Sequence, residues 1–435
     1  MVITPIEEMM TKVKRISENP LKAQQDEENE QLIIEKYELG GNKKKSKEAP
    51  LETVMLEQTL IKIGGLLALG FGEAGSSIIA KNMSGGEDIN PMLAGQKVIC
   101  IFGFCDIRNF TDATEELQEG VMLFVNEIGE IVHGIVDKYS GAANKNIGDA
   151  FLLVWKFDED SMEHDEETDE IYLQPSNKVS QLCDMSMISF LKIMAALKRS
   201  RKMKVYAKHE GLNRRMPGYS VKLGFGLHLG WAIEGAIGSY YKIDASYLSP
   251  HVNMAGRLEE MTKAFGAPML ISGSVYDYFT EECKAMCRQI DHVILKGMEE
   301  TLRLYTCDVY IEDLVLEEEK PPLTKQMKKQ ARVKARIARD SYKEKIGMGE
   351  IQVSGLFETD KDLLEMRSKF TQAFFDTFND GFSLYKRGDW DLARKVLRTV
   401  AMVKKMPDLP SENLIKVMEA HDFKAPDDWP GYRQF

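Results

Sequence analysis

The sequence has no apolar run long enough to cross a bilayer. The longest run, residues 63–72, lies between Lys62 and Glu73 and falls well short of the roughly 20 residues that a membrane span requires. The first residues, MVITPIEEMMTKVKR, are amphipathic and charged, so they do not predict a secretory signal. From the sequence alone we therefore expect a cytoplasmic chain without a transmembrane segment.

Excess positive charge and paired cysteines are missing as well. The net charge of the 435 residues is −11, which argues against nucleic acid as a partner because strong binders need a clustered positive surface. The six cysteines are scattered without a CxxC pair, a pattern typical of buried or free thiols in a reducing compartment. Cys283 and Cys287 have no second ligand pair, so zinc is not expected. A hydrophobic content of 43% is enough for a sizeable core.

Two aspartates stand at the edges of apolar, β-type runs between residues 98 and 157. The run VICIFGFCDIRNFT places Asp106 just past a strand, and NKNIGDAFLLVWKF places Asp149 at the tip of a hairpin. A helix of about six turns is predicted between them, over residues 116–139. Either aspartate alone is typical of a residue that caps backbone amides. Together they predict a metal site where carboxylates emerge from a buried sheet.

Further motifs follow downstream. An alternating strand is predicted over 221–228, and the glycine-rich stretch 230–239 is of a kind that lets backbone approach phosphate. In SPHVNMAGRLE, Asn253 and Arg257 are four residues apart and therefore point from the same face of one helix. Lys296 stands at the start of a predicted closing hairpin.

The combination of FCDIRNFT, NIGDAF and VNMAGR resembles the class III nucleotidyl cyclases, and the sequence around these motifs resembles that of protist members. This resemblance implies an α+β fold with a ferredoxin-like βαββαβ catalytic domain and helical N- and C-terminal extensions. It implies that Asp106 and Asp149, with the backbone carbonyl of Ile107, hold two Mg²⁺ ions, or Mn²⁺. Phe110 and Thr111, which follow in the same motif, are implied to bind substrate.

The resemblance also implies roles in phosphate and base recognition. Arg257 matches the residue that stabilises charge on the α-phosphate in the transition state, Asn253 the residue that orients the ribose, and Lys296 the one that binds the terminal phosphates. Lys145 and Ser246 fall where these enzymes contact the base. Lysine at the first position is typical of adenylyl cyclases, and a hydroxyl can accept from the adenine amino group. The pair favours ATP and formation of cyclic AMP, with a guanylyl cyclase making cyclic GMP as the alternative.

One chain carries both the metal-binding and the phosphate-binding residues, which implies a head-to-tail homodimer with two equivalent sites and an inactive monomer. Besides ATP and a second copy, membrane-embedded or ciliary assembly partners stay open, so the cytosolic face of a membrane or cilium is an alternative location. From another class, the chain could be a structural or regulatory scaffold subunit with a cyclase-like dimer module.

We expect five segments along the chain. The catalytic domain carries an insertion at about 157–216, expected to be a surface excursion whose acidic run is a solvated loop. Two helices of a C-terminal hairpin are predicted over 361–386 and 391–405, with Asp389 capping the second. The segments are 1–50, an amphipathic helix and charged linker; 51–95, a lead-in helix; 96–312, the catalytic domain; 313–355, a basic helix and linker; and 356–435, the helical hairpin and tail.

Overall fold

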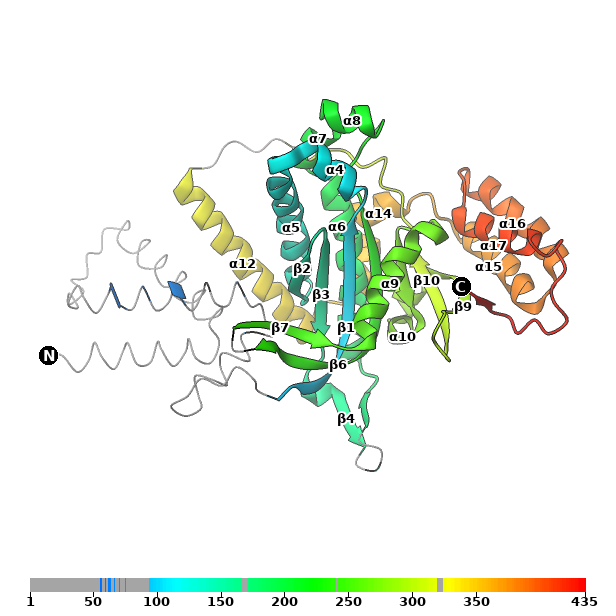
Figure 1. Cartoon of the computed structure of the whole chain (residues 1–435), viewed down its shortest axis with the longest axis horizontal. Helices are drawn as coiled ribbons and strands as arrows, with labels where there is room; N and C mark the ends of the chain where they lie inside the picture. Colours follow the sequence, from blue (N-terminus) through cyan, green and yellow to red (C-terminus); the bar gives the residue numbers. More distant parts are fainter. Residues whose placement is uncertain are drawn as a thin grey trace.

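The computed structural model describes residues 94–435 except 166, 168–169, 240 and 319–323, together with isolated positions between 55 and 75. The helix and linker predicted for residues 1–50 lie outside the described residues, as does most of the lead-in helix predicted for 51–95. The described part is built around one mixed sheet with helices packed against it (Figure 1).

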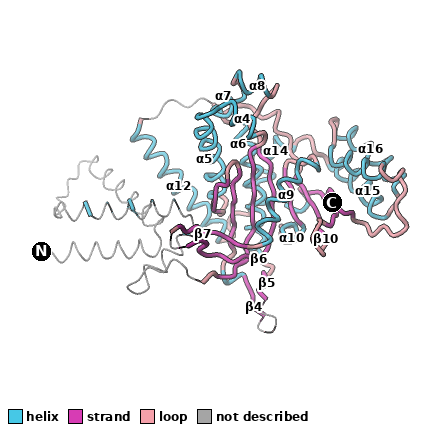
Figure 2. The backbone as a smooth tube through the Cα atoms, viewed as in Figure 1, coloured by secondary structure: helices cyan, strands magenta, loops and turns pink. Residues whose placement is uncertain are grey.

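The central sheet has nine strands in the order β11-β9-β10-β8-β6-β1-β3-β2, with β7 paired to β6. β1 lies in its middle, antiparallel to both β3 and β6, while β8 runs parallel to β6. Figure 2 shows the long central strands running side by side. The strands are β1 (Gln96–Ile107), β2 (Ala142–Ile147), β3 (Ala150–Lys156), β6 (Leu223–Ser239), β7 (Lys242–Leu248), β8 (Met269–Ser272), β9 (Cys287–Ile294), β10 (Thr301–Cys307) and β11 (Arg433–Gln434).

Alternate side chains of β1 enter two different cores because successive residues of a strand face opposite sides. Ile99 and Ile101 belong to a core with α5 (Val121–Lys138) and α6 (Asn177–Arg199). Val98 and Phe102 face the other side, where Ala255 of α9 (Pro250–Phe265) packs. The α+β fold expected from the sequence is confirmed.

The insertion at about 157–216 is not simply a surface excursion, and that expectation is wrong for its central helix. α6 is buried, and its Phe190 packs against Trp155 and Phe225, with ring centroids 5.9 and 4.8 Å apart. Among the described residues it is the one helix long and apolar enough to span a membrane, but 78% of that window is buried inside the protein. Its apolar surface therefore completes the core.

The rest of the insertion forms short elements at the periphery. The acidic run, expected as a loop, includes a two-stranded hairpin of β4 (Met162–Asp165) and β5 (Glu170–Leu173), which projects from one end of the sheet (Figure 2). The basic stretch that follows α6 forms α7 (Arg201–Ala207) and α8 (Glu210–Arg215). α7 and α8 lie beyond the opposite end of the sheet from β4 (Figure 1).

The single helix predicted over 116–139 is broken. α4 (Phe110–Leu117) ends at Gln118, whose φ of 50° lies in the left-handed region, and a short 3₁₀ turn (Gln118–Gly120) leads into α5. The apolar periodicity continues across the break, so the pattern alone could not reveal it. The basic helix expected within 313–355 is α12 (Lys325–Gly347).

The C-terminal region is helical and packs against β9 and β10, near the edge of the sheet where β11 is the last strand. The first hairpin helix, predicted over 361–386, is wrong as a single helix: it is divided into α14 (Lys361–Arg367) and α15 (Gln372–Arg387), whereas the second corresponds to α16 (Trp390–Lys404). Gly388, with φ of 88°, separates α15 from α16, and the predicted cap is wrong because the Asp389 side chain makes no capping hydrogen bond. Short α10 (Gly273–Tyr276) and α11 (Glu281–Ala285) precede β9. The remaining helices are α13 (Leu356–Thr359) and α17 (Leu409–Glu419).

A buried arginine joins this helical unit to the sheet. Arg288 of β9 donates to both carboxylate oxygens of Asp308 at 2.7 and 2.8 Å and to Asp408, which caps α17, at 2.7 and 3.0 Å. Its guanidinium also lies 4.2 Å from the ring centroid of Phe378 in α15. Although burial alone would raise the pKa of Asp408, Arg288 holds that pKa well below its usual range.

Candidate active site

Asp106 is the penultimate residue of β1, paired with Ala150 of β3 and with Gly224 of β6. The sequence predicted Asp106 just past the strand, but the structure places it inside the strand. The neighbouring Ile107 N–H donates to the carbonyl oxygen of Asp149 at 3.2 Å. This bond ties the end of β1 to the β2–β3 turn.

Asp149 directly follows Gly148, whose φ of 66° allows the tight turn between β2 and β3. The pKa of Asp106 is raised by burial and then by the charge of Asp149, so the two carboxylates are close enough to repel each other. Carboxylate oxygens are the ligands that Mg²⁺ prefers, and a cation would relieve this repulsion. The two residues fit a divalent metal, although no three His, Cys, Asp or Glu side chains gather into a metal site among the described residues.

The surroundings of Asp106 include charged groups that sequence reasoning missed. Arg108 Nη2 lies 2.8 Å from Glu259 Oε1 and also donates to Thr262 Oγ1. Burial raises the pKa of Glu259 to about 7, while Arg108 acts in the opposite direction. Lys263 acts with Arg108 to lower the pKa of Asp106. The position of Arg108 two residues after Asp106 was the signal that could have pointed to it.

Phe110 and Thr111 begin α4, directly after Asn109, which adopts a left-handed conformation with φ of 57°. Phe110 packs against the main core, and Thr111 is exposed. The N–H groups of a first helical turn have no partner within the helix and favour anions. This helix start, four residues from Asp106, can therefore bind phosphate oxygens.

Asn253 and Arg257 lie on the exposed face of α9, whose other face packs into the core. Ser249 caps the helix by accepting from the His251 N–H. Arg257 Nη2 lies 3.4 Å from the carbonyl oxygen of Lys296, which is in the turn between β9 and β10. Three of the predicted site residues therefore gather at one place.

The two groups of residues lie apart within one chain. We call the end of β1 and the β2–β3 turn, which carry Asp106 and Asp149, the metal edge. The C-terminal half of α9 approaches it, because Thr262 contacts Arg108. Asn253 precedes Thr262 by nine residues and Arg257 precedes it by five, which correspond to about 14 and about 8 Å along an α-helix. Asn253 and Arg257 are exposed whereas Thr262 is buried, so the two exposed residues lie on the opposite face of α9 from the contact with Arg108. One chain thus presents two separate half-sites, the first with two carboxylates and the second with an amide and two cations.

Lys145 and Ser246 come from β2 and β7. Lys145 Nζ lies 3.9 Å from Asp244 Oδ2, and Asp244 is two residues before the buried Ser246. Residues two apart in a strand share a face, so Asp244 and Ser246 lie on the same side of β7. Asp244 is a polar neighbour of Lys145 that sequence reasoning had not considered.

The glycine-rich stretch 230–239 is not a phosphate loop. It is the second half of β6, which pairs with β7 over Ile233–Ser239. A Cβ at position 230 would lie 2.2 Å from the His251 ring, and a Cβ at 238 would lie 2.1 Å from the Lys242 carbonyl oxygen. These glycines therefore serve close packing and a tight turn.

Comparisons with known proteins give the context for this geometry. Residues 94–308 match the family model of the adenylate and guanylate cyclase catalytic domain, and residues 1–84 match that of the RasGEFs all helical domain. An adenylate cyclase of Anabaena cylindrica is 26% identical over 204 residues, which are 46% of this chain and 35% of that protein. The terminal-differentiation specific adenylate cyclase of Dictyostelium discoideum is 26% identical over 211 residues, covering 48% of this chain and 8% of that one.

Among solved structures, the chain matches a bacterial light-regulated adenylyl cyclase, 20% identical, with a TM-score of 0.43 over 68% of this chain and 72% of that one. The catalytic core of a rhodopsin-guanylyl cyclase with converted specificity, in complex with ATPalphaS, is 20% identical, with a TM-score of 0.36 over 49% of this chain and 98% of that one. This chain spans about a third or less of the length of its curated relatives. By its family match, the chain carries in residues 94–308 a catalytic domain of the class III nucleotidyl cyclase family.

Proposed function

We propose that this chain is an adenylyl cyclase that converts ATP to 3′,5′-cyclic AMP and pyrophosphate, with residues 96–312 as its catalytic domain. The observation that carries the proposal is the pair of half-sites in one chain. The first consists of Asp106 at the end of β1 and Asp149 in the neighbouring β2–β3 turn, and the second is the cluster of Asn253, Arg257 and Lys296 on α9 and the β9–β10 turn. In the reaction the ribose 3′-oxygen bonds to the α-phosphorus, the bond to the β-phosphate breaks, and the 3′-hydroxyl proton is lost.

The chain's own residues would act mainly by positioning and by charge. Asp106 and Asp149, with the carbonyl of Ile107, would hold the divalent cations, which supply Lewis-acid activation of the 3′-hydroxyl and neutralise the triphosphate. The N–H groups of the first turn of α4, at Phe110 and Thr111, would donate hydrogen bonds to phosphate oxygens. Arg257 would donate to the α-phosphate as negative charge develops.

We propose further that one active site needs two copies of the chain. The two half-sites lie apart in one chain, so a head-to-tail dimer would bring the carboxylates of one copy to Asn253, Arg257 and Lys296 of the other. The second half of β6, from Trp231 to Ser239, pairs with β7 over Ile233–Ser239 and forms with it what we call the β6–β7 arm. This arm carries exposed apolar side chains suited to such an interface, namely Trp231, Ile233, Ile237 and Leu248. ATP as substrate and six cysteines that form no disulfide bond support the cytoplasm as the compartment.

The composite site predicts complementation between two inactive variants. Asp106→Ala and Arg257→Ala should each reduce cyclic AMP formation by at least a hundredfold, because each homodimer lacks one half of both sites. Mixed and refolded together, they should regain up to about a quarter of wild-type activity, since half of the dimers are mixed and each then keeps one intact site.

The measurement is cyclic AMP release from ATP with Mg²⁺ or Mn²⁺. Asp106→Ala mixed with Asp149→Ala is the matched control and should stay inactive, because both substitutions damage the same half-site. Full activity of either single variant would contradict the site assignment. Activity loss without rescue in the first mixture would instead contradict the dimer.

A guanylyl cyclase is the second candidate, and the base pocket distinguishes the two. Lys145, Asp244 and Ser246 offer groups that can bind the adenine ring nitrogens and amino group. Lys145→Glu combined with Ser246→Cys should shift kcat/KM from ATP toward GTP by at least tenfold. The same substitutions should leave the dependence on Mg²⁺ unchanged. Unaltered nucleotide selectivity would argue against these residues as the base contacts.

A further inference from the structure

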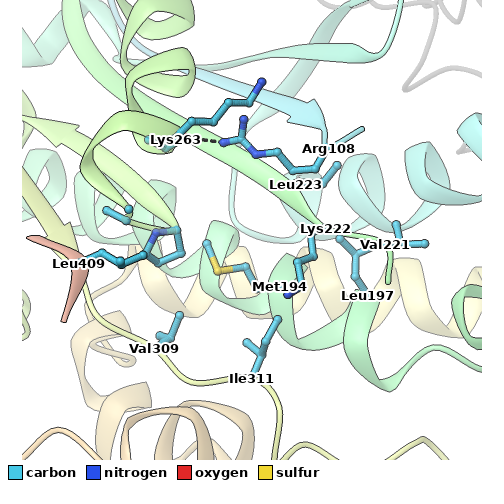
Figure 3. A pocket seen from close by; sticks show the side chains of 14 residues that line it. Arg108, Met194, Leu197, Val221, Lys222, Leu223, Lys263, Val309, Ile311 and Leu409 are labelled. Atoms are coloured by element: carbon cyan, nitrogen blue, oxygen red, sulfur yellow. Dashed lines mark hydrogen bonds between the residues drawn. The ribbon is translucent and has the colours of Figure 1, made fainter. Parts of the chain in front are cut away.

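A cavity of about 390 Å³ lies behind the metal edge, outside the half-sites described above (Figure 3). Its volume is in the range of small-molecule sites, which run from roughly 300 to 1,000 Å³. It is lined by α6, the start of β6, the end of α9, the segment after β10 and the first residue of α17, and it is partly open to the surface. The insertion and the C-terminal helices therefore both contribute to its wall.

Most of the lining is aliphatic, and the charged residues that line it are cations. The apolar residues include Met194, Val309 and Ile311, and the cations are Arg108, Lys222 and Lys263. Figure 3 shows Arg108 and Lys263 on one side and the side chains of Met194, Val309 and Ile311 on the other. Lys222 is paired with Glu312 at 3.5 Å, so Arg108 and Lys263 are the cations we consider for a ligand.

The Arg108 side chain is held in place by two partners, but one of its guanidinium nitrogens has no hydrogen-bond acceptor within the described residues. Its Nη2 binds Glu259 and Thr262, and its guanidinium occupies the space that a Cβ at Gly224 would fill, at 1.7 Å from Nη2. Its Nη1 is buried and has no hydrogen-bond partner within the described part of the chain. An unpaired buried donor is costly, and a carboxylate is the acceptor that matches a guanidinium best.

We propose that this cavity binds a small amphipathic carboxylate, with its head group at Arg108 and its alkyl tail between α6 and the segment after β10. The apolar walls favour a chain of methylene groups, and the cations select a negative head over a neutral or positive one. The occupant would contact Arg108, which is two residues after Asp106 in the chain. Its binding would therefore alter the position of the metal edge. This assignment concerns ligand binding and is independent of the nucleotide reaction.

The test measures binding of decanoate to the full 435-residue chain by isothermal titration calorimetry, below the micelle concentration. Decanoate should bind saturably, and 1-decanol and decyltrimethylammonium should bind at least tenfold more weakly. Arg108→Met should weaken decanoate binding at least tenfold and leave 1-decanol binding unchanged. If this variant fails to fold, Lys263→Met on the exposed side of α9 replaces it, with an expected loss of about threefold, because a more exposed cation contributes less.

A cavity-filling substitution provides the second arm. Ile311→Trp should abolish binding of both decanoate and 1-decanol by occupying the tail space. Val315→Trp is the matched control, because Val315 is in the same segment, is 64% exposed and does not line the cavity. The proposal is overturned if decanoate shows no saturable binding, if the neutral or cationic probe binds as tightly, or if Ile311→Trp binds decanoate like the wild type.

Discussion

His228 is a buried histidine beside the first turn of α9. Its Nε2 lies 2.9 Å from His251 Nδ1, and its Nδ1 lies 3.4 Å from Ser274 Oγ. Burial, followed by the neighbouring His251, lowers the pKa of His228 to about 3. The native protein therefore keeps this ring neutral at a pH where an unfolded chain would protonate it.

This difference predicts acid sensitivity. Below the unfolded pKa of about 6.5, the unfolded state binds a proton that the native state does not bind, so the free energy of unfolding falls as the pH falls toward 3. Between pH 7 and 5 the contribution of His228 should be up to about 2 kcal/mol. His228→Gln should flatten the pH dependence in urea unfolding, whereas His164→Gln, on exposed β4, should retain it. Identical slopes for wild type and His228→Gln would contradict this origin.

Residue-level prediction from the sequence was best where a motif is local. Asn253 and Arg257 are four apart on one helix, and their shared exposed face follows from helical geometry alone. The contact of Arg108 with Thr262 joins residues 154 apart, so no local pattern carries it. Lys145 was identified from its motif, but its ion pair with Asp244 depends on the placement of the β6–β7 arm.

At the scale of elements, α9 and β6 approach each other unusually closely. A Cβ on Gly226 would lie 2.1 Å from the Ala255 carbonyl oxygen and 2.6 Å from the Glu259 nitrogen. These neighbours are backbone atoms, so they cannot move aside like a flexible side chain. The helix that carries Asn253 and Arg257 is thus positioned by the absence of a side chain on the strand beneath it.

Gly226→Ala should therefore destabilise the protein by about 1–3 kcal/mol, as overpacking typically does, and should lower activity by shifting α9. Gly134→Ala provides the comparison, because Gly134 in α5 has open space around its missing Cβ. Alanine there should be neutral or stabilise the helix by up to about 1 kcal/mol. Urea unfolding measures both, and equal stabilities of the two variants would show that the close approach is unimportant.

Periodicity located most of the elements but not their breaks or burial. The β2–β3 hairpin, α9 and α12 follow the predicted patterns closely. The break at Gln118 depends on a left-handed residue that is not glycine, and therefore leaves no mark in the pattern. The burial of α6 was missed because its polar neighbours, the acidic and basic runs, suggested an exposed insertion as a whole.

At the scale of the whole molecule, the C-terminal helices and the sheet form one packed body. The sequence predicted a small helical hairpin and tail within 356–435, and the structure packs the hairpin against β9. It could not indicate where, because the Arg288–Asp408 pair joins residues 120 apart. A buried arginine with two carboxylates is unfavourable unless all its partners are present, so this contact favours one docking position over others.

The tail after α17 returns to the sheet next to Lys296. β11 pairs in parallel with β9, and the Lys296 N–H donates to the Phe435 carbonyl oxygen at 3.3 Å. Trp429 in the same tail donates to the Tyr385 carbonyl oxygen of α15 at 3.2 Å. The helices and the β9–β10 turn are therefore mechanically linked through a short strap. A movement of α15 and α16 would therefore be transmitted to the backbone of Lys296. It would displace or restrain this proposed phosphate ligand without any contact at the nucleotide itself.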